Sequence, residues 1–219
     1  MVFLQNIHAL DVEITNKEFE GSLNAEYNRT LYFIGGFSET GRFVFNERLA
    51  VKGGISLGWA NDLTAVKLFT HATFRILADW PLEAKLAWAY NGMPEAEAHS
   101  HAIAPIVSWN AKYWGISAGF GVRFTSFYGE PALFELLAPV KVYGNFINND
   151  KICVGMSLSN FNDFHMDSFI AFALGANVTV KLNEMWSIVN ELEYTQSGAD
   201  GLTSDFHGIA WKGGVKCAW

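Results

Sequence analysis

Large apolar side chains alternate with small, polar or charged ones in run after run of this chain, most regularly between residues 113 and 219. Successive side chains of a β-strand point to opposite faces, so each run predicts a strand with one apolar face and one small polar face. The run 167–182 is the clearest example, and its apolar positions are Ile170, Phe172, Leu174, Val178 and Val180. Because the pattern recurs many times, it indicates an architecture built from such strands.

The runs and the turn residues between them predict about twelve antiparallel strands, with about ten as the alternative. The strands are expected at residues 5–16, 21–37, 42–60, 63–78, 83–91, 100–110, 113–127, 133–146, 150–161, 167–181, 185–196 and 205–219. Short turns alternate with longer links such as 91–100 and 197–205, and both termini fall on the short-turn side. This alternation is typical of an up-and-down β-barrel. No linker divides the chain, so we expect an all-β fold in a single domain over residues 1–219.

Composition indicates which way the apolar face points. Charged residues make up 17% of the chain and hydrophobic residues 50%, whereas charged residues are about 25% of a typical soluble domain. No apolar run approaches the roughly 20 residues of a membrane helix, so only strands could cross a bilayer. The polar face is rich in Gly and Ser, which suits a confined interior. We therefore predict a transmembrane β-barrel. The alternative, a soluble lipocalin-like barrel binding a small apolar ligand, has the two faces reversed.

Aromatic residues gather at the predicted strand ends, where they would form two rings around the barrel. Trp and Tyr favour the headgroup level of a bilayer, because the ring is partly dehydrated there while the polar atom stays in contact with water. The predicted membrane-interface residues are Trp59, Tyr90, Trp109, Trp114, Trp186, Tyr194 and Trp219.

The last strand carries a resemblance to a known family. Residues 208–219 place Ile209, Trp211, Val215 and Trp219 on the apolar face and end on an aromatic residue. This segment resembles the terminal strand of bacterial outer-membrane β-barrel proteins, although Trp replaces the usual Phe and Cys217 stands where a larger apolar residue is common. The resemblance implies a bacterial outer-membrane location, contact with outer-membrane lipid, and recognition of this strand by the barrel-assembly machinery. No signal peptide is visible at residue 1, so we expect a mature chain.

Extending the alternation through every strand assigns the charged residues to faces. Most of the fifteen Lys and Arg residues fall on the inward face, together with fewer acids, although the net charge of the chain is -7. The lumen is therefore predicted to be basic. The predicted pore-lining residues are Arg48, Lys52, Lys67, Arg75, Lys85, Arg123, Glu135, Lys141, Lys181, Glu191, Glu193 and Lys212. Further residues assigned to this face are Asp11, Glu13, Glu83, Lys151 and Lys216.

These features predict a narrow porin-like channel for small solutes with a modest anion preference. A barrel of about eight strands is filled by its own side chains and one of about sixteen leaves an aqueous channel, so about twelve lies between. A basic lining attracts anions. The alternatives are a barrel sealed by ion pairs between inward Lys, Arg and Glu residues, and a lipid-modifying outer-membrane enzyme. The acidic net charge argues against a nucleic-acid partner.

Catalytic and metal-binding signals are weak. The candidates are the run His99, Ser100 and His101, and the pairs Asp205 with His207 and Asp163 with His165. None has the sequence context of a known nucleophile. Residues 115–119 fit the letters G-x-S-x-G but lie inside an alternating strand, where the required strand–turn–helix context is missing. We expect no catalytic residue, no metal and no cofactor. Cys153 and Cys217 fall on opposite faces, which argues against a disulfide.

Overall fold

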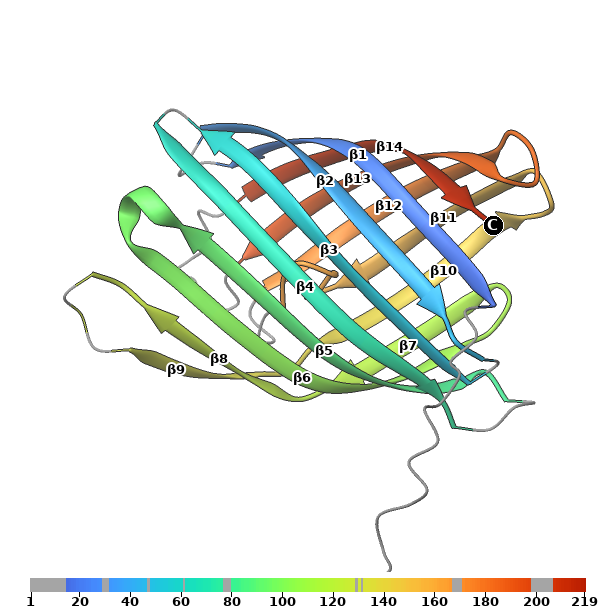
Figure 1. The fold of residues 1–219 in the computed structure, drawn as a ribbon, viewed down its shortest axis with the longest axis horizontal. Coiled ribbons are helices and arrows are strands. Elements are labelled where there is room, and N and C mark those ends of the chain that lie inside the picture. Colours follow the sequence, from blue (N-terminus) through green and yellow to red (C-terminus); the bar gives the residue numbers. More distant parts are fainter. Residues whose placement is uncertain are drawn as a thin grey trace, which may run out of the picture.

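The computed structural model describes residues 15–28, 32–46, 48–60, 62–76, 80–128, 130, 132–166, 171–197 and 207–219. They form a closed antiparallel barrel of twelve strands, two of them interrupted and therefore carrying two labels each (Figure 1). Its strands are β1 (Asn16–Asn28), β2 (Tyr32–Val44), β3 (Leu49–Ala60), β4 (Leu63–Arg75), β5 (Leu82–Met93), β6 (Ala98–Asn110), β7 (Trp114–Gly119), β8 (Gly121–Ser126), β9 (Leu133–Leu137), β10 (Val140–Asn148), β11 (Ile152–Ser159), β12 (Ala171–Lys181), β13 (Trp186–Ser197) and β14 (His207–Ala218).

Each strand pairs with its sequence neighbours, and β1 pairs with β14 to close the ring. That last pairing runs from Glu18 opposite Ala218 to Asn28 opposite Gly208. The start of β1 and the end of β14 therefore lie at the same end of the barrel, to the right in Figure 1, together with the turns after β6, β10 and β12. We call this the short-turn end and the opposite one the long-loop end. This confirms the predicted up-and-down barrel.

A proline accounts for each of the two interruptions. β7 and β8 are separated by Phe120, which faces Pro105 of β6, and only a 3.4 Å bond from the Phe120 N–H to the Pro105 carbonyl joins them there. Proline has no N–H, so it cannot complete the ladder of hydrogen bonds at that point. β9 and β10 are separated at Ala138 and Pro139 for the same reason.

The predicted boundaries are wrong before residue 63. The predicted strand 21–37 spans both β1 and β2, and the predicted strand 42–60 runs through the turn at Asn46. The Asn46 Oδ1 accepts bonds of 2.8 Å from the N–H groups of Arg48 and Leu49, which turns the chain without Gly or Pro. The predicted strand 5–16 lies almost wholly outside the described residues. The predicted total of about twelve strands is still correct. The single predicted strand 21–37 covers two strands, and the additional predicted strand 5–16 offsets this in the count.

Only one short helical segment, the 3-10 turn η1 (Pro94–Ala96), occurs among the described residues, and it joins β5 to β6. The link between these strands is therefore shorter than the expected 91–100, since β5 continues to Met93 and β6 begins at Ala98. Within the described ranges, no helix is long and apolar enough to cross a membrane.

The outer face of the barrel is apolar and the inner face is small or polar. Leu23, Phe120 and Leu136 point outward and are 64%, 74% and 72% exposed. Inside, the Ser22 and Ser38 hydroxyls are buried and hydrogen-bonded at 2.7 Å. A soluble lipocalin-like barrel would have these faces reversed, so the structure excludes that alternative. An exposed apolar surface of this kind faces lipid, and the fold is a transmembrane β-barrel.

A charge placed on the outer face should destabilise the barrel according to its depth. Leu23 lies mid-way along β1, and we expect Leu23→Arg to lower the free energy of unfolding by about 2–4 kcal/mol. The matched control is Leu182→Arg, because Leu182 is 59% exposed but lies just beyond β12 at the short-turn end. It should cost about 0–1 kcal/mol. Urea titration of the barrel in lipid vesicles measures both costs, and equal costs would contradict this placement.

Candidate functional site: the lumen and its internal loop

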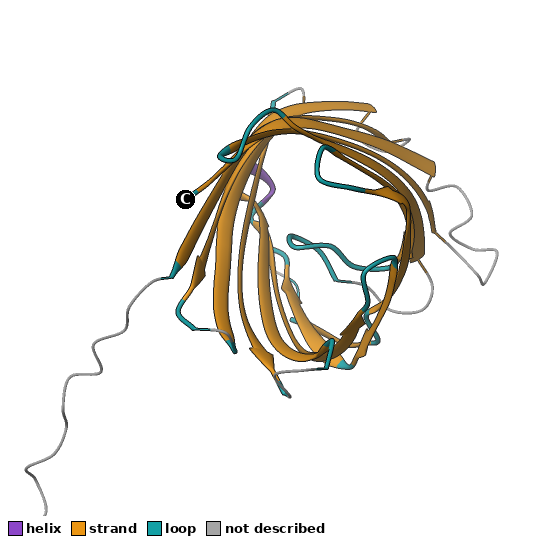
Figure 2. Cartoon of the chain, turned by 90° about the vertical axis from the view of Figure 1, so that its right-hand side faces the viewer, coloured by secondary structure: helices purple, strands orange, loops and turns teal. Residues whose placement is uncertain are grey.

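Residues 160–166, between β11 and β12, fold into the barrel and form what we call the lumen loop. Figure 2 shows loop segments inside the ring of strands. The base of the lumen loop is fixed by the buried Asn160, whose Oδ1 accepts from the Val140 N–H at 2.6 Å and whose Nδ2 donates to the Ala138 carbonyl at 2.9 Å. These bonds use backbone groups beside the Pro139 interruption. The missing stretch of ladder therefore serves as the attachment point of the loop.

The lumen loop is a small hairpin. An antiparallel bridge joins Phe161 and Met166, and the Asn162 Oδ1 accepts a bond of 2.9 Å from the Phe164 N–H. The Asn162 N–H in turn donates to the His165 carbonyl at 2.8 Å. An asparagine that accepts from the backbone two residues ahead tightens a turn without glycine. This turn presents Asp163 and Phe164 at the tip of the hairpin.

Apolar packing holds the loop against the β5–β6 wall. Met166 is 2% exposed, and it belongs with Leu137 and Ile106 to a buried cluster on which Phe161 also packs. The other members of the cluster are Ala87, Ala89, Ala102 and Ala104. Side chains larger than alanine at these inward positions would take the space of the loop. The small residues on this part of the inner face therefore make room for residues 160–166.

The tip of the loop also contacts strands β3, β4 and β5. The Phe164 ring meets the Phe69 ring edge-on at 4.7 Å, and the Phe164 carbonyl accepts from Asn91 Nδ2 at 3.1 Å. Phe69 itself lies over Gly54, where a Cβ would come within 2.6 Å of the Phe69 ring. On another wall, Arg123 Nη1 donates to the Met166 carbonyl at 3.2 Å. The loop is thus fixed from several sides of the lumen.

An ion pair joins the loop tip to the wall. Lys52 Nζ lies 2.5 Å from Asp163 Oδ2, and His71 Nδ1 lies 3.8 Å from Oδ1. Burial alone would raise the pKa of the Asp163 carboxyl. The Lys52 ammonium attracts the carboxylate and donates a hydrogen bond to it. This interaction, with a smaller contribution from His71, holds the pKa of Asp163 below its usual value. Asp163 is therefore negatively charged at neutral pH.

Basic groups from several strands surround Asp163. The Asp163 carboxylate interacts electrostatically with the ammonium groups of Lys52 and Lys85, and Lys85 in turn interacts with Lys141. Around Glu193 of β13 the charges are mixed, and the groups that act on it are Glu191, Lys141, His165 and Glu26. The lumen therefore has a basic side around Lys52 and Lys85 and an acidic side around Glu191 and Glu193.

Strand register places almost all of the predicted pore-lining residues on the inner face. They are Lys52, Lys67, Arg75, Lys85, Arg123, Glu135, Lys141, Lys181, Glu191, Glu193 and Lys212. Arg48 is the exception, because it lies exposed in the turn between β2 and β3. Lys151 likewise lies in the turn before β11, and Asp11 and Glu13 fall outside the described residues.

Most of the inward cations have a carboxylate beside them. Ion pairs between wall residues of the described barrel are Arg123–Glu135 at 2.6 Å, Lys216–Glu18 at 2.9 Å, Arg42–Glu18 at 3.5 Å, Arg75–Glu83 at 3.8 Å, Lys67–Glu26 at 4.0 Å and Lys212–Glu20. Among the residues that the structure describes, Lys85 and Lys141 have no ion-pair partner, and neither have Glu191 and Glu193. These four inward side chains carry charges that are not held in direct ion pairs, although Lys141 and Glu193 interact electrostatically.

Sequence reasoning missed the inward acids of β1. Glu18, Glu20 and Glu26 face the lumen, and so does Arg42 of β2. A signal for them exists, since the acids alternate with Phe19, Leu23 and Tyr27. For Glu18 and Glu20 it is lost because the predicted strand begins at residue 21, whereas Glu26 lies within that predicted strand and is left unassigned there. With these acids the inner face is closer to charge balance than the sequence suggested.

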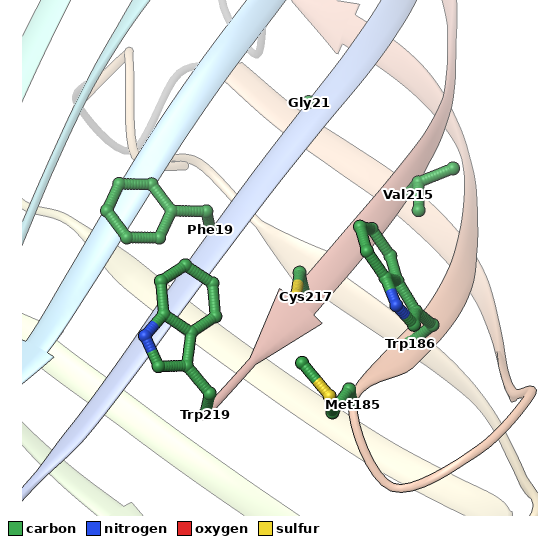
Figure 3. Close-up of a pocket in the computed structure, with 7 residues that line it drawn as sticks. All are labelled: Phe19, Gly21, Met185, Trp186, Val215, Cys217 and Trp219. Carbon is green, nitrogen blue, oxygen red and sulfur yellow. The ribbon is translucent and has the colours of Figure 1, made fainter.

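The aromatic residues predicted for the membrane interface all point outward. Trp59, Tyr90 and Tyr194 lie toward the long-loop end, and Trp109, Trp114, Trp186 and Trp219 lie at the short-turn end. Figure 3 shows part of the second group around an apolar groove of about 670 Å³ on the outer face, where β13, β14 and β1 meet. Phe19, Met185, Trp186, Val215, Cys217 and Trp219 line it. The groove faces lipid and is separate from the lumen.

The catalytic candidates are not assembled. His99 and His101 point outward, with ring centroids 6.0 Å apart, whereas Ser100 points into the lumen. Asp163 pairs with Lys52 and not with a serine. Asp205 lies outside the described residues. Within the described ranges no group of three His, Cys, Asp or Glu residues could hold a metal ion. Cys153 and Cys217 are both free and lie on opposite faces.

Three solved structures have similar backbones. The translocator domain of the autotransporter NalP from Neisseria meningitidis has a TM-score of 0.62 at 11% identity, over 92% of this chain and 87% of that one. The NanC porin has a TM-score of 0.61 at 8% identity, over 90% and 98%. An outer-membrane channel from Pseudomonas putida F1 has a TM-score of 0.58 at 9% identity, over 100% of both chains. This chain has the fold of bacterial outer-membrane β-barrels.

Sequence comparison adds nothing closer. No protein-family model matches the sequence, and no curated protein matches it. Identities this low establish the fold and leave the function to be argued from the lumen of this barrel.

The Lys52–Asp163 pair should stabilise the lumen loop measurably. A double-mutant cycle with Lys52→Gln and Asp163→Asn should give a coupling of about 1–2 kcal/mol in urea unfolding. This is less than for a fully buried pair, because the two side chains are 27% and 33% exposed. The control cycle uses Arg75 and Glu83, which are 3.8 Å apart and 44% and 24% exposed. That coupling should stay below about 1 kcal/mol. A coupling no larger than the control would show that the loop tip is held without this pair.

Proposed function

We propose that this barrel is a narrow channel for small solutes in the bacterial outer membrane, with a modest preference for anions. The observation that carries the proposal is the lumen loop, which occupies part of the barrel interior. The loop places Asp163 beside Lys52, so that a solute crossing the barrel passes among charged side chains of known sign. Solute selection in such channels depends on pore width and on the charges at the narrowest point.

Lys85 and Lys141 support the anion preference. Both point into the lumen from different walls and act on each other electrostatically, and within the described residues neither has an ion-pair partner. A cation that is not neutralised by a neighbouring carboxylate attracts anions in a space partly shielded from bulk water. Glu191 and Glu193 on the acidic side oppose this attraction, and they limit the preference to a modest one.

One observation favours a second candidate, a sealed structural barrel. The lumen loop is fixed to several walls, and most inward charges are paired. If these contacts close the lumen completely, no solute crosses the barrel. The protein would then act through the surfaces that it exposes outside the membrane. The two candidates differ in one measurable property, which is ion conductance.

Conductance of the purified barrel in planar bilayers tests the channel. We expect discrete single-channel steps, with a reversal potential under a KCl gradient that indicates an anion-to-cation permeability ratio above one. Complete absence of steps would favour the sealed barrel.

The double variant Lys85→Glu with Lys141→Glu should bring the anion-to-cation permeability ratio below one, because it reverses the charges of two inward lysines that are not in ion pairs.

The matched control is Lys151→Glu combined with Lys181→Glu. These lysines are exposed at the short-turn end, and the control makes the same change in net charge. It should shift the ratio much less, since charges in contact with bulk water are screened within about 10 Å. Equal shifts in the two double variants would show that selectivity follows the net charge of the protein and not the constriction.

A further inference from the structure

The tip of the lumen loop presents two different groups to the wall. Asp163 directs its carboxylate at Lys52, and the next residue, Phe164, places its phenyl ring on Phe69. Both contacts belong to one compact surface, because Lys52 Nζ lies 5.6 Å from the centre of the Phe69 ring and His71 lies 5.7 Å from the same ring. A carboxylate and an aromatic ring are thus held side by side on a matching cation and aromatic face.

We propose that Lys52, His71 and Phe69 form a binding site for small aromatic carboxylates, and that Asp163 and Phe164 occupy this site as an internal ligand which the solute displaces. The proposal rests on the channel proposed above, because solute must reach the lumen. It names a class of solute, a small aromatic acid with one carboxylate, that anion preference alone does not specify.

The charged half of the site fits a carboxylate in particular. One oxygen of Asp163, Oδ2, accepts a bond of 2.5 Å from Lys52 Nζ, and the other, Oδ1, lies 3.8 Å from the His71 ring, beyond hydrogen-bond distance. Lys85 adds positive charge nearby, and no carboxylate pairs with it among the described residues. When Asp163 moves away from the wall, Lys52 and Lys85 are left without a neighbouring anion. A solute carboxylate would replace the ion pair that Lys52 has lost.

The apolar half of the site fits a ring. Phe69 is 3% exposed and its edge-on partner is Phe164, a geometry that aromatic pairs prefer. Removing Phe164 would uncover an aromatic face next to Lys52. A hydrated anion such as chloride cannot cover that face, and an aromatic carboxylate can cover it while its charge remains on Lys52.

The internal ligand also sets the strength of binding. A group tethered by a short loop competes at an effective concentration of the order of millimolar or more, so a solute of equal intrinsic affinity binds weakly to the natural chain. Weak binding is compatible with transport, because a solute that binds tightly leaves the constriction slowly. Removing the tethered carboxylate should therefore strengthen solute binding.

Equilibrium binding of 4-fluorobenzoate to the detergent-solubilised full chain tests the site, with the fluorine NMR signal as readout. We expect weak binding to the natural chain and at least about tenfold tighter binding to Asp163→Asn. Lys52→Gln combined with Asp163→Asn should remove that gain. Asp62→Asn is the matched control, since Asp62 is an exposed carboxylate in the β3–β4 turn, and it should leave binding unchanged. Unchanged binding in Asp163→Asn would overturn the proposal.

A second variant tests the apolar half of the site without changing the charge of the loop. Phe164→Ala should tighten 4-fluorobenzoate binding more than acetate binding, because only the aromatic acid gains the uncovered Phe69 face. Equal gains for the two acids would overturn the aromatic part of the site. Faster migration of unheated than of heated protein on a detergent gel shows that each variant retains the closed barrel.

The binding experiment and the conductance experiment test the two proposals separately. A barrel that binds 4-fluorobenzoate as expected but conducts no ions has the site without a through path, which supports this inference and overturns the channel. A barrel that conducts but shows no tighter binding in Asp163→Asn overturns the inference and supports the channel.

Discussion

Backbone hydrogen bonding is the constraint from which the rest of this structure follows. In the hydrocarbon region no water is available to the N–H and C=O groups of the chain, so every strand must be paired on both sides. The antiparallel pairing of β1 with β14, from Glu18 to Asn28, removes the last free edge. Once the ring is closed, alternate side chains have only two environments, lipid and lumen. The apolar exterior and the small polar interior are the two consequences.

The interior of the barrel must be filled, whereas the exterior is covered by lipid. A ring of about twelve strands is wider than one that its own side chains fill. Here the inner alanines of β5 and β6 leave additional space, and the lumen loop occupies it through Met166 and Phe161. Charged pairs such as Arg123–Glu135 line other parts of the wall. The same segment that packs the interior therefore also decides which groups a passing solute would meet.

The sequence allowed the strands to be predicted wherever the alternation was bounded by recognisable turns, which holds from residue 63 onward. It failed earlier because the chain turns at Asn46 without Gly or Pro. The lumen loop could not be predicted. Residues 160–166 have no alternation, and the group that holds Asp163, Lys52, comes from a strand that only the closed barrel brings near. Local pattern predicts strands and faces, whereas a loop that crosses the interior depends on long-range contacts.

The lumen loop also has a place in the order of folding. Lys52 and Asp163 are 111 residues apart in sequence, and Asn91 and Phe164 are 73 apart. Contacts this distant carry a large loss of chain entropy, which must be met before they contribute to stability. The loop tip can dock only when β3, β4 and β5 already stand opposite β11. Narrowing of the lumen therefore depends on the prior assembly of these strands.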